Sequence, residues 1–445
     1  MHPRRLWSIF LAIALQLAVG FSRQGKRRFV EWAASLALNV EEHTITQSLV
    51  GIDRPEDWKA LESFAEYGSW DLDWLQRRCG RVIGELPDSR WHGYHVWAGD
   101  DTKVHRNSPT VWGTCTFHEY TARCPNRAQT VRAHNWVVLG ALLPVAEQPA
   151  LFLPVTGQLY FRKSQMPAGE TFRTKNELLV AELRQQSTEQ EGPHLAVFDG
   201  AFAVSNVVRT LVRPAAGKPR IEFITRLRRD ARLCELPPTA RPKHKRGPMP
   251  KWGRPLSPPR CGGRWPGLWR EGTVFLYGRR RNVRWKEPRC QWRVLGHEDP
   301  VKAVVAEVEG YSERFTLVTS AIRLTGLEVL ELFCARFRQE DGFRDLKQRL
   351  GWEECRAWTK NPINRTTQIL FETLTLLRLL QRRLDEEAGD TWWLHPPWNE
   401  RKTRPSVLDI ERLLRQHHTE IRECLSEWLV SEGKIEPDLP STGPP

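Results

Sequence analysis

The sequence predicts an α/β fold, in which a sheet and helices form one core, and three observations lead to that prediction. Strand-like segments and one helix alternate in the chain between about residues 94 and 198. Acidic residues stand at the ends of two of these strands, where α/β sheets usually place their sites. A helix-like segment with one acid among several cations then follows a long basic stretch. We expect a helical region before the sheet and a basic insertion within it.

Composition favours a protein that binds nucleic acid. The 445 residues suffice for two or three domains with substantial cores. A net charge of +14 and a pI near 9.6 indicate a polyanionic partner. The 20 Trp residues suit both core packing and stacking on bases. The nine Cys residues form no CxxC pair, which is typical of reduced thiols in a cytoplasmic protein.

The N-terminal region, residues 1–90, is expected to be helical, and its basic segment Lys26-Arg27-Arg28 favours contact with DNA. The apolar run from Leu6 to Phe21 resembles a signal peptide, but Gln16 interrupts it and no clean cleavage site follows. The run is also short for a membrane span, and its helical spacing continues to Leu36. We therefore predict a buried helix here and no membrane partner. No helix-turn-helix spacing is sharp enough to name.

The first part of the α/β domain is predicted over residues 91–225. Its expected elements are strands over residues 94–99, 111–120, 135–143 and 151–159, a helix over 176–186 and a strand over 195–198. The first strand continues into Asp100 and Asp101, and the last ends on Asp199. Strand alternation alone does not choose between Asp100 and Asp101.

A zinc site is an alternative that the spacing does not favour. Cys115, His118, Cys124 and His134 lie close together in the chain, but they match no standard zinc pattern. Their flanks are strand-like, so we interpret them as structural residues.

A basic, Trp-rich insertion is predicted over residues 226–310. Residues 226–293 carry 20 Lys and Arg against four Asp and Glu, and the middle is rich in Pro and Gly. One interpretation is a disordered basic loop with a few buried Trp residues. The other is a surface that binds phosphates and stacks on exposed bases. Under it, Trp285 and Trp292 are the stacking candidates, and Trp252 and Trp265 pack a loop.

The segment from Phe333 to Lys347 is read as one helix. At about 100° per residue, one stripe collects a single acid and three cations with an aromatic residue: Phe333, Arg336, Glu340, Arg344 and Lys347. Thr325 and Glu328 form a capping box just before it. The alternative is an ordinary salt-bridged surface.

The remaining boundaries follow from this helix. Residues 311–390 would form the second part of the α/β domain, including a long buried helix from Asn361 to Leu384. Residues 391–445 would hold a helix over about 406–429 and a disordered tail.

Asp101, Asp199 and Glu340 form the predicted catalytic and metal-binding set. Converging carboxylates repel one another unless cations neutralise them. Oxygen ligands of this kind suit Mg²⁺ or Mn²⁺, and two such ions serve phosphoryl transfer. Arg336 and Lys347 would then hold DNA phosphates beside the metals.

At these residues the sequence resembles bacterial insertion-sequence DDE transposases, specifically the insertion-sequence-four-like group. Asp101 before Thr102 looks like the group's first acid motif, and Phe198-Asp199 looks like the second. Arg336, Glu340 and Lys347 match the spacing of its signature of Tyr, Arg, Glu and Lys. The resemblance covers residues 94–380, and Phe333 replaces the signature Tyr.

The resemblance implies a fold and an activity. The fold would be ribonuclease H-like, with a mixed sheet flanked by helices and a β-rich insertion between the second Asp and the Glu. The activity would be metal-dependent cleavage of terminal inverted repeats and their transfer to target DNA, by a homodimer in the cytoplasm, at the nucleoid when bound to DNA. A nuclease that does not join strands, or a non-catalytic DNA-binding derivative, remains an alternative.

Overall fold

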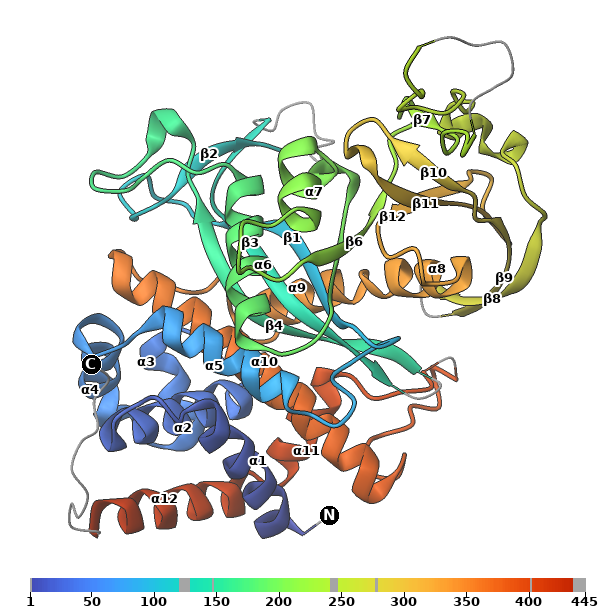
Figure 1. Ribbon diagram of the computed structural model, residues 1–445. Coiled ribbons are helices and arrows are strands. Elements are labelled where there is room, and N and C mark those ends of the chain that lie inside the picture. Colours follow the sequence, from blue (N-terminus) through green and yellow to red (C-terminus); the bar gives the residue numbers. More distant parts are fainter. Residues whose placement is uncertain are drawn as a thin grey trace. The chain divides into compact units, whose positions relative to one another are not determined.

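The computed structural model describes residues 2–119, 129–145, 148–240, 247–276, 279–400 and 402–434. The chain divides into two compact units (Figure 1). Unit 1 combines residues 1–78 with residues 345–445, and unit 2 is the stretch from Cys79 to Arg344. Unit 1 thus joins the first helices to about the last hundred residues of the chain.

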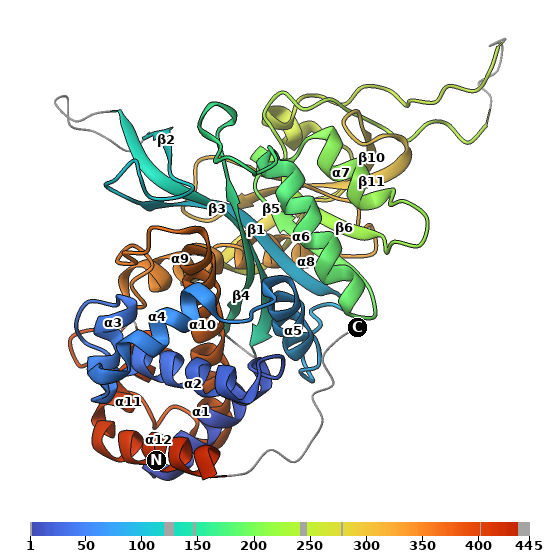
Figure 2. The same ribbon diagram turned by 90° about the vertical axis from the view of Figure 1, so that its left-hand side faces the viewer.

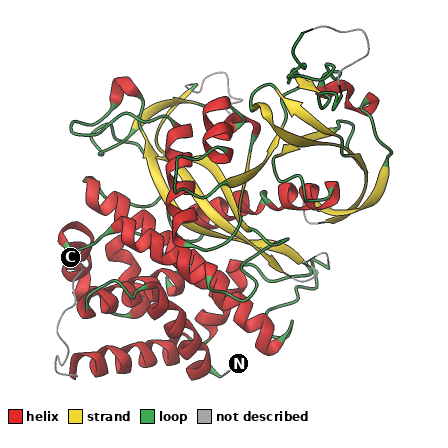
Figure 3. Ribbon diagram, in the orientation of Figure 1, coloured by secondary structure: helices red, strands yellow, loops and turns green. Residues whose placement is uncertain are grey.

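Unit 1 is helical wherever the structure describes regular elements in it (Figure 3). The N-terminal share comprises α1 (Pro3–Leu17), α2 (Arg23–Leu38), α3 (Ile45–Ser48), α4 (Trp58–Tyr67) and the start of α5 (Leu72–Gly84), with 3₁₀ turns at Leu49–Ile52 and Pro55–Asp57. The C-terminal share comprises the end of α9 (Arg338–Gln348), α10 (Lys360–Ala388), α11 (Val407–Gln416) and α12 (His418–Lys434).

The apolar N-terminal run forms the helix α1. Leu6, Phe10 and Leu17 are among its buried side chains, and the helix packs against α2, α10 and α12. The predicted buried helix is thus present. No helix among the described residues is both long and apolar enough to cross a membrane.

The long helix α10 buries a carboxyl group in unit 1. Glu372 has no exposed surface, and one of its oxygens accepts a hydrogen bond from Gln368 Nε2 at 3.1 Å. The other oxygen has no hydrogen-bond partner among the described residues. Burial raises the pKa of Glu372 well above 4.5, and the Gln368 hydrogen bond opposes this only in part.

We expect Glu372→Gln to stabilise the protein at neutral pH. Below about pH 4.5 the carboxyl is protonated in both the folded and unfolded chains, so the two proteins should be similarly stable. As the pH rises, the unfolded chain ionises first, and the wild type loses about 1.4 kcal/mol per pH unit until the folded pKa is reached. Urea unfolding from acid to neutral pH measures this difference. The exposed Glu386→Gln in the same helix is the control, and parallel stability curves for wild type and Glu372→Gln would refute the prediction.

Unit 2 is built on a sheet of 12 described strands. The first strands are β1 (His95–His105), β2 (Cys115–His118), β3 (Thr130–Val145), β4 (Gln148–Tyr160), β5 (His194–Phe198) and β6 (Ile221–Arg226). The later strands are β7 (Leu233–Cys234), β8 (Arg270–Leu276), β9 (Arg279–Lys286), β10 (Arg289–Trp292), β11 (Gly296–Val308) and β12 (Phe315–Thr319).

The strand order is β2-β3-β1-β5-β6-β12-β11-β10-β7, with β4 on β3 and the β8–β9 hairpin on β11. β3 is antiparallel to β1, whereas β1, β5 and β6 are parallel neighbours. Helix α6 (Lys175–Glu189) packs on β1, β3 and β4, and α7 (Ser205–Val212) packs on β6 (Figures 1 and 2). This mixed sheet flanked by helices confirms the predicted α/β class and is consistent with a ribonuclease H-like fold.

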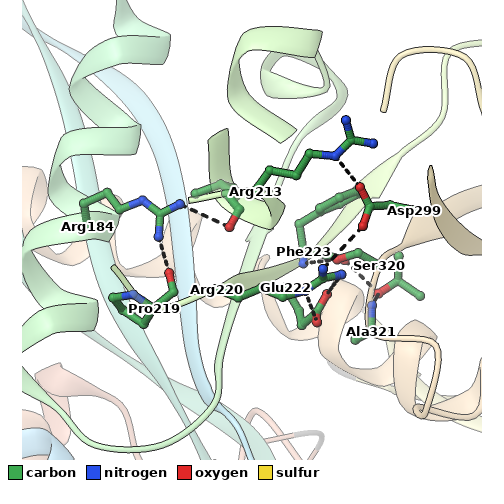
Figure 4. Close-up of polar contacts among 11 residues, drawn as sticks. Arg184, Arg213, Pro219, Arg220, Glu222, Phe223, Asp299, Ser320 and Ala321 are labelled. Carbon is green, nitrogen blue, oxygen red and sulfur yellow. Dashed lines mark hydrogen bonds and ion pairs between the residues drawn. The ribbon is translucent and has the colours of Figure 1, made fainter. Parts of the chain in front are cut away.

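The insertion continues the core sheet. β11 pairs with β12, and β12 pairs with β6, so backbone hydrogen bonds join the inserted strands to the core. Figure 4 shows polar contacts that reinforce the join. Arg213 Nε and Arg220 Nη1 lie 2.5 and 3.4 Å from the carboxylate of Asp299, and Phe223 N–H donates to Ser320 Oγ at 3.0 Å. The described strands of the basic segment therefore extend the core sheet.

Candidate active site

The first two candidate acids lie at neighbouring positions of two parallel strands. β1 and β5 pair in register, with Gly99 opposite Phe198. Asp100 and Asp199 are the next residues on their respective strands, and Asp199 keeps an extended backbone with φ −73° and ψ 164°. Asp100 lies in the middle of β1, and Asp199 directly follows the end of β5, so the two carboxylates lie close together where β5 ends.

Asp100 and Asp101 point to opposite faces of this sheet. A Cβ added to Gly99 would lie 2.4 Å from Leu179 of α6, so Gly99 faces that helix. Asp101 shares this face by strand alternation, and Lys175 Nζ of α6 lies 2.6 Å from its Oδ2. Asp100 faces the other side, where Arg336 Nη1 lies 2.9 Å from its Oδ2. Arg336 follows helix α8 (Gly326–Ala335).

Burial and four neighbouring groups determine the pKa of the Asp100 carboxyl. Burial raises its pKa to about 6, and the negative charges of Asp101 and Asp199 act in the same direction. The Arg336 guanidinium and a 2.8 Å hydrogen bond from the Asp101 N–H oppose the rise. The charge of Asp199 therefore lies near enough to act on the Asp100 carboxyl.

The third candidate acid is set apart from this pair. Glu340 lies on α9, is exposed, and has no ion-pair partner among the described residues. Across the described ranges, no group of three or more His, Cys, Asp and Glu residues is arranged to hold a metal ion. The structure therefore brings together Asp100 and Asp199 and leaves Glu340 outside the cluster.

The helix that was predicted to run from Phe333 to Lys347 is broken, and the continuous-helix prediction was wrong. α8 ends at Ala335, and α9 starts at Arg338. The turn between them carries short-range hydrogen bonds, such as Arg336 N–H to the Phe333 carbonyl at 3.2 Å. No Pro or Gly causes the break. The Arg336 side chain is 5% exposed and directed at Asp100, and this anchoring provides a tertiary reason for the turn.

The cations of the predicted stripe have separate partners. Arg344 pairs with Asp341 at 2.9 Å, with 58% of the Arg344 side chain exposed. Lys347 Nζ lies 3.8 Å from Glu353. Phe333 is buried, and the Arg336 guanidinium lies 5.7 Å from its ring centroid. The surface salt bridges expected between Glu340 and Arg336 or Arg344 are absent from the described ion pairs.

The two Trp residues selected for base stacking are buried. Trp285 is 5% exposed, and its ring lies 2.4 and 3.2 Å from Cβ atoms built on Gly326 and Gly272. Trp292 is 2% exposed and lies 6.1 Å from the Phe223 ring. Both indoles therefore pack the sheet, which weighs against the stacking role predicted for them.

Two other indoles of the insertion are more accessible and lie beside cations. Trp269 is half-buried, with Arg284 and Lys286 at 5.0 and 5.2 Å from its ring centroid. The Arg293 guanidinium lies 4.1 Å from the ring of Trp252. Sequence reasoning missed Trp269, because only the β-hairpin geometry brings these cations onto its ring. The predicted packing of Trp265 is present, since this side chain is 1% exposed and donates to the Ser257 carbonyl at 2.9 Å.

The Cys and His residues of the rejected zinc alternative have structural contacts. His134 Nε2 lies 2.8 Å from the Trp112 carbonyl, and burial lowers the His134 pKa to about 4. Cys115 is buried, with its pKa raised by burial. Cys124 lies outside the described residues.

We expect the exposed and buried cations of this region to affect DNA binding differently. Arg344→Ala should lower the slope of log affinity against log salt by about one, because an exposed guanidinium can reach a phosphate. Arg336→Ala should leave the slope nearly unchanged and reduce cleavage, because its guanidinium is engaged with Asp100. Fluorescence anisotropy titrations over a range of salt concentrations measure both slopes.

The sequence alone predicts that Arg336→Ala and Lys347→Ala each lower the slope by about one. We keep this prediction for Lys347 and revise it for Arg336, because Arg336 is paired with Asp100. A lower slope for Arg336→Ala than for Arg344→Ala would contradict the assignment of Arg336 to Asp100.

A family model described as "DDE superfamily endonuclease" matches residues 16–299. The match includes Asp100, Asp101 and Asp199 and ends before Glu340. The comparison with curated proteins found no similar sequence.

Proposed function

The chain belongs to the DDE superfamily endonuclease family, and from that premise we propose that it is a DNA transposase of the insertion-sequence-four-like group. It would bind the terminal inverted repeats of its element, cleave them and join the ends to target DNA. The observation that carries the proposal is the pairing of Asp100 with Asp199 on parallel strands of a ribonuclease H-like sheet. The basic insertion supports DNA as the substrate.

The proposed catalytic carboxylates are Asp199, Glu340 and one member of the Asp100–Asp101 pair. The sequence motif favours Asp101, because it directly precedes Thr102. The geometry supports Asp100, which shares a sheet face and a charge environment with Asp199. Asp101 has a lysine partner from α6 on the opposite face. We therefore assign the first catalytic carboxylate to Asp100.

These residues fit a divalent cation. Mg²⁺ and Mn²⁺ take one or two carboxylates and complete their shell with water and substrate phosphate. The mutual repulsion of Asp100 and Asp199, which contributes to the raised Asp100 pKa, is what such a cation relieves. When bound, one or two ions would polarise the phosphoryl group and activate the attacking oxygen.

The protein's own groups would prepare the site before DNA arrives. Arg336 neutralises Asp100 and holds its carboxylate toward the Asp199 side of the sheet. Gln339 Nε2 donates to the Val138 carbonyl at 3.2 Å, and this contact fixes the start of α9 against β3. Glu340 follows Gln339 directly, and we propose that it joins the pair when DNA and metal bind.

The proposed function also implies a partner subunit and a site of action in the cell. A homodimer would hold the two ends of one element, each subunit acting on one end. The site of action would be the nucleoid in the bacterial cytoplasm. Unit 1, with its basic Lys26-Arg27-Arg28 segment, is the proposed region for recognising the inverted repeats.

A strand-transfer assay tests the proposed function. The substrate is a labelled duplex from the DNA flanking the gene, supplied either intact or with a pre-cut 3′ end, together with a target plasmid and Mg²⁺ or Mn²⁺. A transposase cuts the intact end and joins both substrates to the plasmid. Cleavage without joining of the pre-cut end would identify a nuclease, and binding without cleavage would identify a non-catalytic derivative.

A further inference from the structure

An arginine-lined cavity of about 570 Å³ opens beside the second acid in unit 2. Strands β6 and β12, the end of β11 and a short 3₁₀ turn at Pro259–Arg264 contribute to its wall. The cationic residues in the wall are Arg226, Arg229, Arg260 and Arg314. Hydroxyl groups of Tyr311, Ser312 and Thr316 line it as well.

Strand register places this cavity next to the candidate active site. Thr225 of β6 is the register partner of Phe198 of β5, so Arg226 and Asp199 are the next residues on neighbouring strands. A Cβ built on Gly200 would lie 3.2 Å from the Arg226 carbonyl oxygen. A strand of DNA held at Asp199 therefore passes within reach of the cavity wall.

The charges in the cavity are only partly balanced. Arg314 lies 2.7 Å from Glu307, and Arg229 lies 2.5 Å from Glu313. Neither Arg226 nor Arg260 has an acidic partner among the described ion pairs.

An anionic ligand could reach both Arg226 and Arg260. Both are exposed, and the Arg226 guanidinium lies 5.9 Å from the Phe315 ring centroid. Two arginines without acidic partners in one concave wall leave an excess of positive charge that an anion would balance.

We propose that this cavity binds a backbone phosphate of the DNA strand that lies across Asp199. The guanidinium fork donates two parallel hydrogen bonds to a phosphate, which positions a strand without reading its sequence. The inference rests on the proposed function, since it assigns the same substrate to a second contact surface. It adds Arg226 and Arg260 as positioning residues, which the sequence did not distinguish from the other cations of the insertion.

The test compares two double variants that remove the same charge. Arg226→Ala/Arg260→Ala empties the cavity of its unpaired cations. Arg279→Ala/Arg280→Ala removes two exposed arginines of β9 that do not line the cavity. Binding of a fluorescein-labelled DNA duplex is measured by anisotropy over a range of salt concentrations. We expect the salt slope to fall by about one to two for the cavity variant only. Equal slopes for the two variants would overturn the proposal.

A second measurement locates the contact and does not depend on catalysis. The Asp199→Asn protein is mixed with a duplex that carries a photoreactive azidophenacyl group on one backbone phosphate at the cleavage position, and crosslinked peptides are identified by mass spectrometry. Crosslinks to residues 226–229, 259–261 or 311–316 support the cavity. Crosslinks confined to other peptides overturn it.

The strand-transfer assay, and not the two binding measurements, shows whether the proposed transposase function is wrong. The wild-type protein would then neither cut nor join DNA in the strand-transfer assay, whatever the two binding measurements show. A cavity that binds DNA in a protein without cleavage activity would keep the phosphate contact and remove the transposase assignment.

Discussion

Asp199→Asn and Asp100→Asn are each expected to reduce metal-dependent DNA cleavage by about three orders of magnitude or more. Each change keeps the shape of the side chain and removes the charge that a divalent cation needs. Asp100 in β1 lies beside Asp199 at the end of β5, and the charge of Asp199 acts on Asp100. Affinity for end DNA should stay within about tenfold of wild type, because a carboxylate repels a phosphate and so does not itself stabilise DNA binding. Cleavage of a labelled duplex and anisotropy of the same duplex provide the two measurements.

Asp101→Asn is the matched control for this prediction. It removes the same charge one residue away, from a carboxylate that pairs with Lys175 on the other sheet face. We expect a smaller loss of cleavage from it than from Asp100→Asn. The opposite ranking would favour the sequence motif and return the role of first acid to Asp101. Glu340→Gln should also abolish cleavage, and full activity in all of these variants would place the site elsewhere.

Trp285→Ala is expected to destabilise unit 2 by about 3–5 kcal/mol, as large-to-small changes of buried aromatic residues do. The indole fills the space between the β8–β9 hairpin and the start of α8, in contact with two glycines that have no side chains to replace it. For a unit of this size, the loss lowers the midpoint of thermal unfolding by roughly 10 °C. Calorimetry of the intact chain measures the shift.

Trp269→Ala supplies the comparison, because this indole is half-buried beside Arg284 and Lys286. Trp269→Ala should destabilise unit 2 less than Trp285→Ala does. It should also weaken DNA binding more than Trp285→Ala does. In the cleavage assay, a duplex with a mismatched terminal base pair distinguishes a Trp that packs the protein from a Trp that stacks on an extruded base. Rescue of Trp285→Ala on the mismatched end, with normal unfolding, would show that Trp285 stacks on an extruded base after all.

Local signals in the sequence predicted local structure well. Thr325 and Glu328 predicted a capping box, and the structure contains both of its hydrogen bonds. Apolar runs with β-branched residues predicted most core strands, because burial of such runs is a property of the segment itself. The predicted strand over residues 195–198 matches β5 (His194–Phe198).

Features that depend on distant parts of the chain could not be predicted in the same way. The choice between Asp100 and Asp101 needs the positions of α6 and Arg336, which lie far along the chain. The break before α9 carries no Pro or Gly signal, because it arises from the same contact with Asp100. Burial of Trp285 and Trp292 also escaped prediction, since Trp beside Arg occurs both in packed sheets and on nucleic-acid surfaces.

The division of unit 1 between the two ends of the chain has a consequence for synthesis on the ribosome. The whole of unit 2, from Cys79 to Arg344, is translated before the C-terminal helices of unit 1 emerge. At 5–20 residues per second, the first helices wait roughly 10–50 s for their partners. During that interval the apolar faces of α1 and α2 lack α10 and remain available to chaperones or to aggregation. A nascent chain released after Arg344 should therefore hold a folded sheet unit and an unfinished helical one, which makes late ribosome stalling more damaging than its position in the sequence suggests.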